Sequence, residues 1–403
     1  MKVKIEPSIA KGVISAPPSK SYAHRLLICS ALANGISSVD GILDSKDMEA
    51  TLNCISALGV SYKRENNTVT VDGTNREQPT SEFYCNESGS TIRFFIPIAL
   101  VNGGTSKFYG TERLLCRGFE SYEDICKKQN ILVEKTDRCI SFSGQLKPDT
   151  FNIRGDISSQ FITGLLFALP LLNGDSIINI TTELESASYI DITLDALELF
   201  GIEITRKKNT FFIKGNQKYK PQKTVVEGDM SNAAFLDAFN ILGGDVSVIG
   251  LNPLSKQGDS VYAPMMVDLK YTAPKIDLSD CPDLAPILFA IAACMNGAEF
   301  TGTKRLKIKE SNRAEVMAQE LKKFGIDVTV NENSVIVHKG DFKKPTEILH
   351  GHNDHRIVMA LSVISSVYGG EIDGCEAVSK SYPCFFEDIK GLGIKCEVAN
   401  ENN

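Results

Sequence analysis

The 403-residue sequence contains no apolar run long enough to cross a membrane. The longest, Phe161–Leu172, has twelve residues and includes Pro170, whereas a membrane helix needs about 20. Met1–Pro7 lacks the apolar core of an export signal, so we expect the chain to begin with a strand. A cytoplasmic protein that does not bind membranes is therefore predicted.

An excess of positive charge and a disulfide pattern are also missing. Lys and Arg number 43 against 50 Asp and Glu, which gives a net charge of −7. This balance argues against general nucleic-acid binding but allows a local basic pocket. The eleven cysteines are odd in number and include no Cys-x-x-Cys pair, so we expect reduced thiols in the core. His350, His352 and His355 lack partners at metal spacing, and no metal site is predicted.

What the sequence does contain is typical of a folded globular protein. Apolar residues make up 42% and charged residues 23%, which excludes wholesale disorder. A chain of this length predicts roughly two or three domains.

An internal repeat indicates how these domains are built. Six apolar, helix-like stretches begin at a capping residue and end at a glycine turn: Ser21–Gly35, Ser90–Gly104, Ser159–Gly174, Ser231–Gly244, Asp283–Gly297 and Asp354–Gly370. Their spacing, about 70 residues except for a shorter fourth interval, indicates a structural repeat. Their composition is apolar on nearly every side, which predicts helices buried all round.

A second helical pattern, followed by two short strands, lies between most pairs of these stretches. It is found at Met48–Leu58, Ile192–Phe200 and Ala314–Phe324, and is unclear in the fourth unit near Pro264–Lys270. The unit is therefore strand, helix, strand, helix, strand, strand. Six units predict an α/β (α+β) protein of two domains, each with three β-α-β-α-β-β units, buried helices and outer sheets. Lys218–Lys223 is the expected crossover.

Several of the repeated helices begin with cations, where the helix dipole disfavours them. Lys20–Arg25 opens the first and Asp354–Arg356 the last, and Lys307–Arg313 places Lys309 and Arg313 four residues apart. Solvated surface charge explains one such site, but three at equivalent places favour binding of phosphate or carboxylate groups. Ser88–Arg93 and Ser158–Gln160 add small and hydroxyl-bearing helix starts.

Two carboxylates stand among these cations. Asp283 is either a helix cap or a general base, and Glu310 either neutralises its basic neighbours or acts as a general acid. The residues alone leave both alternatives open.

Six motifs together resemble the 5-enolpyruvylshikimate-3-phosphate (EPSP) synthase family, the 3-phosphoshikimate 1-carboxyvinyltransferases. They are Lys20–Arg25, Ser88–Arg93, Gly155–Gln160, Tyr189–Thr193, Lys309–Arg313 and Asn353–Arg356. The resemblance covers essentially the whole chain and implies the enolpyruvyl transferase fold. It implies an N-terminal domain over residues 13–226 and a C-terminal domain over 1–12 and 227–403, with the active site in the cleft between them.

The resemblance implies transfer of the carboxyvinyl group of phosphoenolpyruvate to the 5-hydroxyl of shikimate 3-phosphate, by addition and elimination, in the biosynthesis of aromatic amino acids through chorismate. No metal or organic cofactor is implied. Catalytic roles fall to Asp283, Glu310 and Lys20. Shikimate 3-phosphate is assigned to Lys20, Ser21, Arg25, Ser158, Ser159, Gln160, Ser186, Asp283, Arg305 and Lys309. Phosphoenolpyruvate is assigned to Lys20, Gly89, Arg117, Gln160, Arg313, Arg356 and Lys380. Inhibition by glyphosate and a monomeric state are expected.

Three residues depart from the family pattern: Glu87 stands where Asn is frequent, Gly118 where Pro is usual, and Arg305 where Asn or Gln is frequent. Two rival functions remain. A carboxyvinyltransferase acting on UDP-N-acetylglucosamine would share the fold, but it lacks the Ser-Ser-Gln and Asn-Asp-His-Arg wording. A non-catalytic anion-binding protein would need the cations but not both Asp283 and Glu310.

Overall fold

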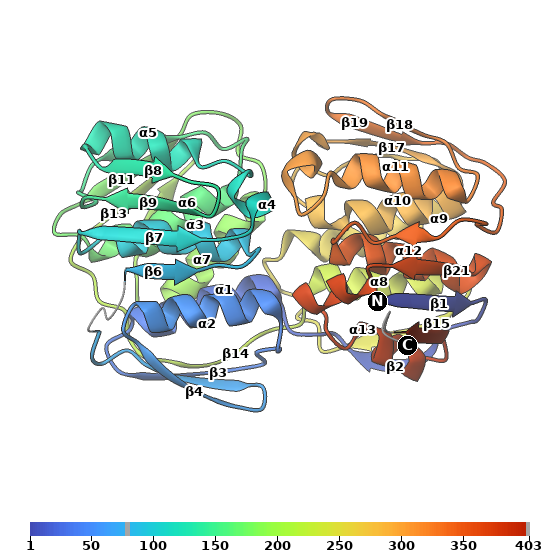
Figure 1. Cartoon of the computed structure of the whole chain (residues 1–403), viewed down its shortest axis with the longest axis horizontal. Coiled ribbons are helices and arrows are strands. Elements are labelled where there is room, and N and C mark those ends of the chain that lie inside the picture. The colour runs from blue at the N-terminus through green and yellow to red at the C-terminus, as the bar shows by residue number, and fades with distance from the viewer. Residues whose placement is uncertain (77–80, 400–403) are drawn as a thin grey trace. The chain divides into compact units, whose positions relative to one another are not determined.

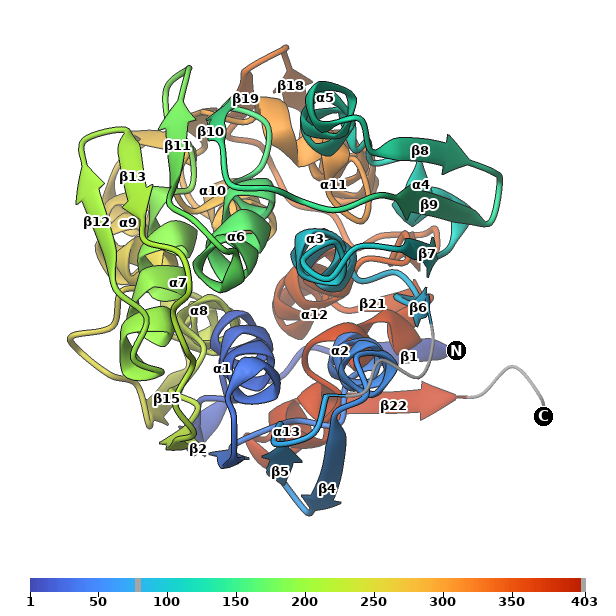
Figure 2. The same cartoon turned by 90° about the vertical axis from the view of Figure 1, so that its left-hand side faces the viewer.

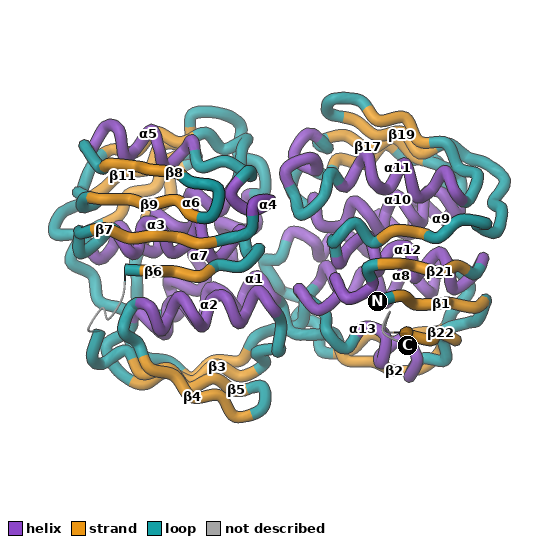
Figure 3. The backbone as a smooth tube through the Cα atoms, in the orientation of Figure 1, coloured by secondary structure: helices purple, strands orange, loops and turns teal. Residues whose placement is uncertain are grey.

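The computed structural model describes residues 1–76 and 81–399 (Figures 1 and 3). Its chain divides into two compact units. Unit 1 comprises Met1–Pro17 and Gly228–Asn403, and unit 2 comprises Pro18–Glu227. Each unit has its own hydrophobic core, as expected for a chain of this length.

Unit 2 contains three four-stranded sheets of one design, with orders β14-β3-β5-β4, β6-β7-β9-β8 and β10-β11-β13-β12. In each sheet the first two strands are parallel and the others antiparallel. The strands are β3 (Ile36–Asp40), β4 (Ser61–Glu65), β5 (Thr68–Asp72), β6 (Glu82–Tyr84), β7 (Thr105–Tyr109), β8 (Leu132–Lys135), β9 (Cys139–Ser143), β10 (Thr150–Ile153), β11 (Ser176–Ile180), β12 (Ile204–Lys207), β13 (Thr210–Ile213) and β14 (Lys223–Val225).

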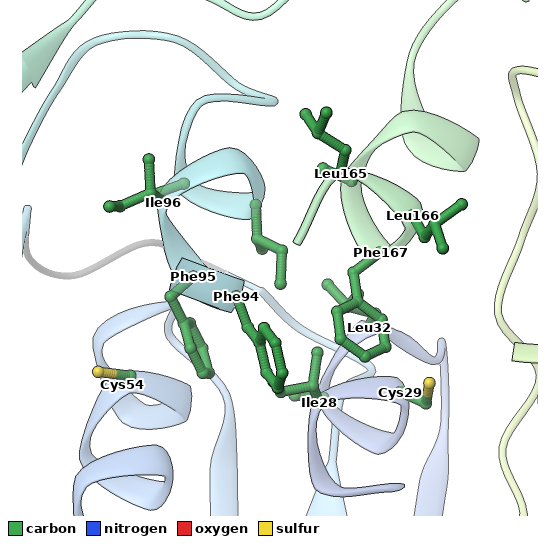
Figure 4. Packing of buried hydrophobic residues seen from close by; sticks show 14 of the residues in the cluster. Ile28, Cys29, Leu32, Cys54, Phe94, Phe95, Ile96, Leu165, Leu166 and Phe167 are labelled. Carbon is green, nitrogen blue, oxygen red and sulfur yellow. The ribbon is translucent and has the colours of Figure 1, made fainter. Parts of the chain in front are cut away.

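Helices fill the space inside these sheets, as Figure 2 shows along the helix axes. They are α1 (Lys20–Leu32), α2 (Lys46–Ala57), α3 (Gly89–Ala99), α4 (Glu112–Leu115), α5 (Glu120–Gln129), α6 (Ser159–Ala168), continued by the 3-10 turn η1 (Leu169–Leu171), and α7 (Ala187–Leu199). Every residue of α1 from Tyr22 to Leu32 is buried, which confirms the predicted all-round burial for this helix. The rings of Phe94 (α3) and Phe167 (α6) meet edge to face at 5.6 Å, next to Ile28 and Leu32 of α1 (Figure 4).

Unit 1 repeats this design twice and shortens it once. Its sheets have orders β20-β21-β1-β22, β16-β17-β19-β18 and β15-β2. The strands are β1 (Lys2–Glu6), β2 (Lys11–Ser15), β15 (Asp245–Ile249), β16 (Lys275–Asp277), β17 (Ala298–Thr301), β18 (Val328–Val330), β19 (Ser334–Val337), β20 (Leu349–His350), β21 (Gly370–Asp373) and β22 (Lys395–Ala399). The helices are α8 (Met230–Ile241), α9 (Tyr262–Tyr271), α10 (Ala285–Cys294), α11 (Arg313–Lys323), α12 (His355–Tyr368) and α13 (Phe385–Gly391), with 3-10 turns η2 (Gly258–Val261), η3 (Pro282–Leu284), η4 (Lys304–Ile308) and η5 (Cys375–Lys380).

The short fourth repeat is explained by its sheet. Its second helix, unclear from the sequence, is α9, and β16 of the next sheet follows that helix, so the strand pair that ends the other repeats is missing here. Among the strands of the described residues, β15 pairs with β2 alone. Loss of two strands accounts for the shorter spacing.

The chain boundaries differ from those predicted. β2 pairs with β15 over Lys11–Ser15, so residues 13–17 belong to unit 1 and not to the N-terminal domain. The predicted crossover at Lys218–Lys223 is wrong, because the chain first adds β14 to the sheet of β3 and leaves unit 2 only after Glu227. The beginning of the chain as a strand is confirmed by β1.

Most helix caps lie one or two residues before the predicted starts. Ser19, Ser88, Ser158 and Asp229 have the extended backbone of a cap, and the side chain of each accepts a hydrogen bond from a backbone N–H in the first turn. Asp354 caps α12 as predicted. Where two polar residues stood close together, the first of them is the cap.

Candidate active site

The start of α1 places two cations at the end of unit 2 where its helices begin. Lys20 Nζ lies 2.8 Å from Asp47 Oδ2 of α2. Arg25 is buried, and its guanidinium donates to Thr193 Oγ1 and to the carbonyl oxygens of Ser21 and Tyr189 at 2.7–2.8 Å. Burial lowers the pKa of Arg25 to about 10. A buried guanidinium held by neutral oxygens is a place where an anion is stabilised.

A second such cation, Arg93, lies on α3 and was not among the predicted site residues. It is buried beside the ring of Phe161. Its guanidinium donates to Gln160 Oε1 at 2.7 Å and to the carbonyl oxygen of Arg117 at 3.0 Å. Burial lowers its pKa to about 9. Arg93 therefore orients two residues that the resemblance assigned to phosphoenolpyruvate.

The first residue of α3, Gly89, is packed against the Arg117 side chain. A Cβ on Gly89 would lie 2.7 Å from Arg117 Nη1, closer than such atoms approach. Gly118 has φ +79°, a conformation closed to proline, whose ring fixes φ near −65°. The proline that the resembled family usually has at this position would therefore not fit this backbone.

The remaining unit 2 candidates lie at the starts of α6 and α7. Ser158 caps α6 by accepting from the Gln160 N–H, and Ser159 follows it. Gln160 Nε2 donates to Ser90 Oγ at 2.9 Å, which links α6 to α3. Ser186 precedes α7 with φ +56° and is buried. Apart from Arg117, which follows α4, the predicted unit 2 residues therefore lie at or near helix starts that hydrogen bonds connect.

In unit 1 the central group is the Asp283 carboxylate. Its Oδ1 accepts from Lys309 Nζ at 3.2 Å and from Arg313 Nη1 at 2.7 Å, and its Oδ2 accepts from Arg356 Nη2 at 3.0 Å. Asp283 lies in η3, before α10, and its side chain is directed at these three cations. The alternative of a helix cap is therefore wrong.

Arg313 also binds two further carboxylates of this cluster. Its Nη2 donates to Glu310 Oε2 at 2.8 Å, and its Nε donates to Asp354 Oδ2 at 2.9 Å. Arg313 is the first residue of α11, whereas Lys309 lies before that helix. Lys309 and Arg313, which lie four residues apart in the sequence, converge on Asp283. One guanidinium thus bridges both candidate acid–base carboxylates.

The other predicted cations of unit 1 donate hydrogen bonds to hydroxyl or carbonyl oxygens. Arg356 Nη2 donates to Ser231 Oγ at 2.9 Å, and Ser231 Oγ donates to Asp229 Oδ1 at 2.6 Å. Lys380 Nζ donates to the carbonyl oxygen of Asn353 at 2.6 Å. Arg305 is buried and donates to the carbonyl oxygen of Ser279 at 2.7 Å.

Charge coupling inside the cluster sets the protonation of its carboxylates. Burial raises the pKa of Asp283, but the charges of Arg356, Lys309 and Arg313 outweigh it and hold this pKa well below its usual range. Burial lowers the pKa of Lys309 despite the nearby Asp283. Asp259, on η2, behaves in the opposite way: burial and the charge of Asp283 raise its pKa to about 7.

Sequence analysis missed three charged residues of these clusters. Asp354 was recognised only as a helix start, Arg93 only as part of a motif, and Asp259 not at all. The Asn-Asp-His-Arg and Ser-Gly-Ser-Thr-Ile-Arg motifs were the available signals for the first two. No motif or spacing in the sequence indicated Asp259, because its raised pKa comes from burial and from the charge of Asp283.

The two clusters are suited to binding a polyanionic substrate and to accepting a proton from it. In unit 2, Arg25 and Arg93 have neutral hydrogen-bond partners. In unit 1, the ionised carboxylate of Asp283 is held by Lys and Arg side chains, which can bind a substrate anion in its place. Within the described residues no group of three His, Cys, Asp or Glu side chains is arranged to hold a metal. Among those same residues, no helix has the length and apolar character of a membrane span.

Solved structures identify the fold class. The EPSP synthase from Acinetobacter baumannii aligns with a TM-score of 0.80 and 25% identity, covering 99% of this chain and 100% of that one. The enolpyruvyl transferase NikO from Streptomyces tendae aligns with a TM-score of 0.77 and 14% identity, covering 98% of both chains. The fold is that of the enolpyruvyl transferases, as predicted.

Sequence comparison narrows this class to one family. The sequence model of EPSP synthase (3-phosphoshikimate 1-carboxyvinyltransferase) matches residues 6–389. Relatives described as 3-phosphoshikimate 1-carboxyvinyltransferase are 41% identical in Clostridium kluyveri, 42% in Clostridium acetobutylicum and 39% in Clostridioides difficile. Alignments cover 97% of both chains for the first two and 99% for the third. The chain belongs to the EPSP synthase family.

Proposed function

We propose that the protein transfers the carboxyvinyl group of phosphoenolpyruvate to the 5-hydroxyl of shikimate 3-phosphate and releases phosphate. Membership of the EPSP synthase family over residues 6–389 supports this activity. The observation that carries it at the level of residues is the Asp283 carboxylate held by Lys309, Arg313 and Arg356. Such a group can act as a base where polyanionic substrates bind.

The unit 2 residues are proposed to hold both substrates at their anionic and polar groups. Shikimate 3-phosphate is assigned to Lys20, Ser21, Arg25, Ser158, Ser159, Gln160 and Ser186, and phosphoenolpyruvate to Lys20, Gly89, Arg117 and Gln160. Arg25 supports the first assignment, because its buried charge is held by neutral oxygens and an anionic ligand would complete its coordination.

The unit 1 residues are proposed to carry the chemistry. Arg313, Arg356 and Lys380 bind phosphoenolpyruvate, while Arg305, Lys309 and Asp283 contact shikimate 3-phosphate. Asp283 accepts the proton of the 5-hydroxyl as its oxygen attacks C2 of phosphoenolpyruvate, and Glu310 donates a proton to the methylene carbon. Elimination then returns the methyl proton to Glu310, and the proton on Asp283 leaves with the phosphate. Both carboxylates finish in their starting states.

Substrate binding itself would adjust these two carboxylates. Arg313 is shared by Asp283 and Glu310 in the ligand-free protein, and it stabilises their charged forms. An anion that takes over Arg313 and Arg356 weakens this stabilisation. Asp283 then becomes a stronger base, as its proposed role requires.

The direct test is phosphate release from phosphoenolpyruvate with and without shikimate 3-phosphate, with the product identified by mass spectrometry. We expect release that depends on shikimate 3-phosphate and a product heavier by the carboxyvinyl group. Release with UDP-N-acetylglucosamine alone would assign the protein to the rival carboxyvinyl transfer. Tight binding of both substrates without turnover would make it an anion-binding protein.

We further propose inhibition by glyphosate, a cytoplasmic location and a monomeric state. Glyphosate is an anion that can engage the cations assigned to phosphoenolpyruvate. The eleven cysteines are free thiols, which fits a reducing compartment. Inhibition measured against phosphoenolpyruvate concentration, cell fractionation and light scattering on a sizing column test these three statements in turn.

A further inference from the structure

A buried carboxylate outside the proposed site, Glu320 of α11, holds the chain segment that leads into α12. Its side chain is 1% exposed. Oε1 accepts from Lys323 Nζ at 3.0 Å and from His352 Nε2 at 2.8 Å, and Oε2 accepts from Lys323 Nζ at 2.8 Å and from the His350 N–H at 2.9 Å. Burial raises the pKa of Glu320, but the hydrogen bonds from His352 and Lys323 outweigh it, so the group is ionised.

The held segment is the loop Gly351–Asp354 between β20 and α12. His352 and Asn353 have φ of +49° and +52°, a left-handed backbone that side chains with a Cβ disfavour. Gly351 is closely packed, because a Cβ there would lie 2.5 Å from Val358 Cγ2. Two consecutive left-handed residues persist only where their surroundings hold them. Glu320 holds them by accepting hydrogen bonds from the His352 side chain and from the backbone N–H of His350, just before the loop.

The same loop supports three cations. The carbonyl oxygen of Asn353 accepts from Lys380 Nζ. Asp354 accepts from Arg313 Nε through Oδ2 and from the Arg356 N–H through Oδ1, which caps α12. These are the unit 1 cations that we assign to phosphoenolpyruvate, whereas the shikimate 3-phosphate residues Arg305 and Lys309 come from η4 and its end.

We propose that Glu320 and His352 are positioning residues that fix the loop Gly351–Asp354 and thereby place Arg313, Arg356 and Lys380 for phosphoenolpyruvate. The proposal rests on the proposed function for the identity of the substrate, but not for the order of the loop. It requires that loss of the Glu320–His352 contact weakens use of phosphoenolpyruvate selectively.

The test compares two pairs of variants. Glu320→Gln replaces one acceptor oxygen by an NH2 group that opposes the existing donors, and Glu315→Gln makes the same change at an exposed position of α11. His352→Leu removes the ring donor, and His352→Gln restores a donor of similar reach. We expect the KM for phosphoenolpyruvate to rise about tenfold or more in Glu320→Gln and His352→Leu, with the KM for shikimate 3-phosphate within about twofold of wild type. Glu315→Gln and His352→Gln should resemble wild type.

Amide hydrogen exchange in the segment 349–357 gives a readout that needs no activity. Faster exchange in Glu320→Gln and His352→Leu, but not in the two controls, supports the proposal; equal exchange in all five proteins overturns it. An equal rise of both KM values, or a lower melting temperature with unchanged KM, also overturns it. Wild-type protein without turnover refutes the proposed function alone, because the exchange comparison still decides the role of the loop. Should Glu320→Gln fail to fold, the His352 pair, at a part-exposed side chain, decides the question.

Discussion

The Arg117 guanidinium occupies the space beside Gly89 that any larger residue would need: a Cβ at position 89 would lie 2.7 Å from Arg117 Nη1 and 3.0 Å from its Cζ. The relationship makes the backbone of the α3 start and the charge of the next loop dependent on each other. A change at either residue is therefore felt at the other.

Gly89→Ala should displace Arg117 rather than unfold α3, because the clash is with the end of a flexible side chain. We expect a higher KM for phosphoenolpyruvate and weaker inhibition by glyphosate, measured by steady-state kinetics. Gly391→Ala, where a Cβ meets no atom within 4 Å, is the matched control. Unchanged glyphosate inhibition in Gly89→Ala would show that the start of α3 does not face the inhibitor.

Asp283→Asn should reduce turnover by at least ~10²-fold, which is the scale of a lost general base. Titration calorimetry should show that the variant still binds shikimate 3-phosphate. The substitution also removes the carboxylate shared by Lys309, Arg313 and Arg356, and breaking a buried ion pair costs about 3–5 kcal/mol. Urea unfolding should show this loss, and added phosphate should reduce it. Near wild-type turnover would exclude Asp283 as the base.

Asp259→Asn, unlike Asp283→Asn, should leave turnover nearly unchanged. The Asp259 carboxyl has a pKa of about 7, against an ordinary value of 3.8. Between these values the folded protein holds a proton that the unfolded chain releases, so stability falls as pH rises through this window, by at most about 1.4 kcal/mol per pH unit. Asn mimics the protonated form. We expect near wild-type activity at pH 7 and a flatter plot of unfolding free energy against pH; an unchanged plot would place the proton elsewhere.

Cys116→Ser should retain most activity with shikimate 3-phosphate. Cys116 is exposed and directly precedes Arg117, so it is the thiol best placed for a covalent step. Cys384→Ser, at the other exposed cysteine, controls for general effects of thiol removal. A loss above ~10²-fold in Cys116→Ser alone would require a covalent mechanism.

Local patterns predicted the helices well, because burial all round leaves a composition that can be read in one stretch of chain. The six repeated helices and three of the intervening ones are present near their predicted places. α5 and α13 were not predicted: α5 carries charge along most of its length and α13 has only seven residues. Strand pairing between distant segments was also beyond local patterns, as β2 and β14 show.

For the candidate site, the motifs indicated which residues matter but not how they pair. Asp283 was left between a cap and a base because a sequence does not show the direction of a side chain. The four-residue spacing of Lys309 and Arg313 did not show that both bind Asp283, because α11 begins only at Arg313 and Lys309 lies before it. Glu320 gave no signal, since a Glu on an amphipathic helix is usually solvated.

The position of β1 at the centre of its sheet has a consequence for how the chain is made. β1 pairs with β21 on one side and with β22 on the other, so Lys2 lies opposite Ala399. A ribosome synthesises β1 before β22, and the whole of unit 2 is synthesised between them. Unit 2 can fold while the chain is still growing, but β1 has neither of its partner strands until β21 and β22 have been synthesised. The sheet that contains β1 is thus completed only after unit 2 has been synthesised.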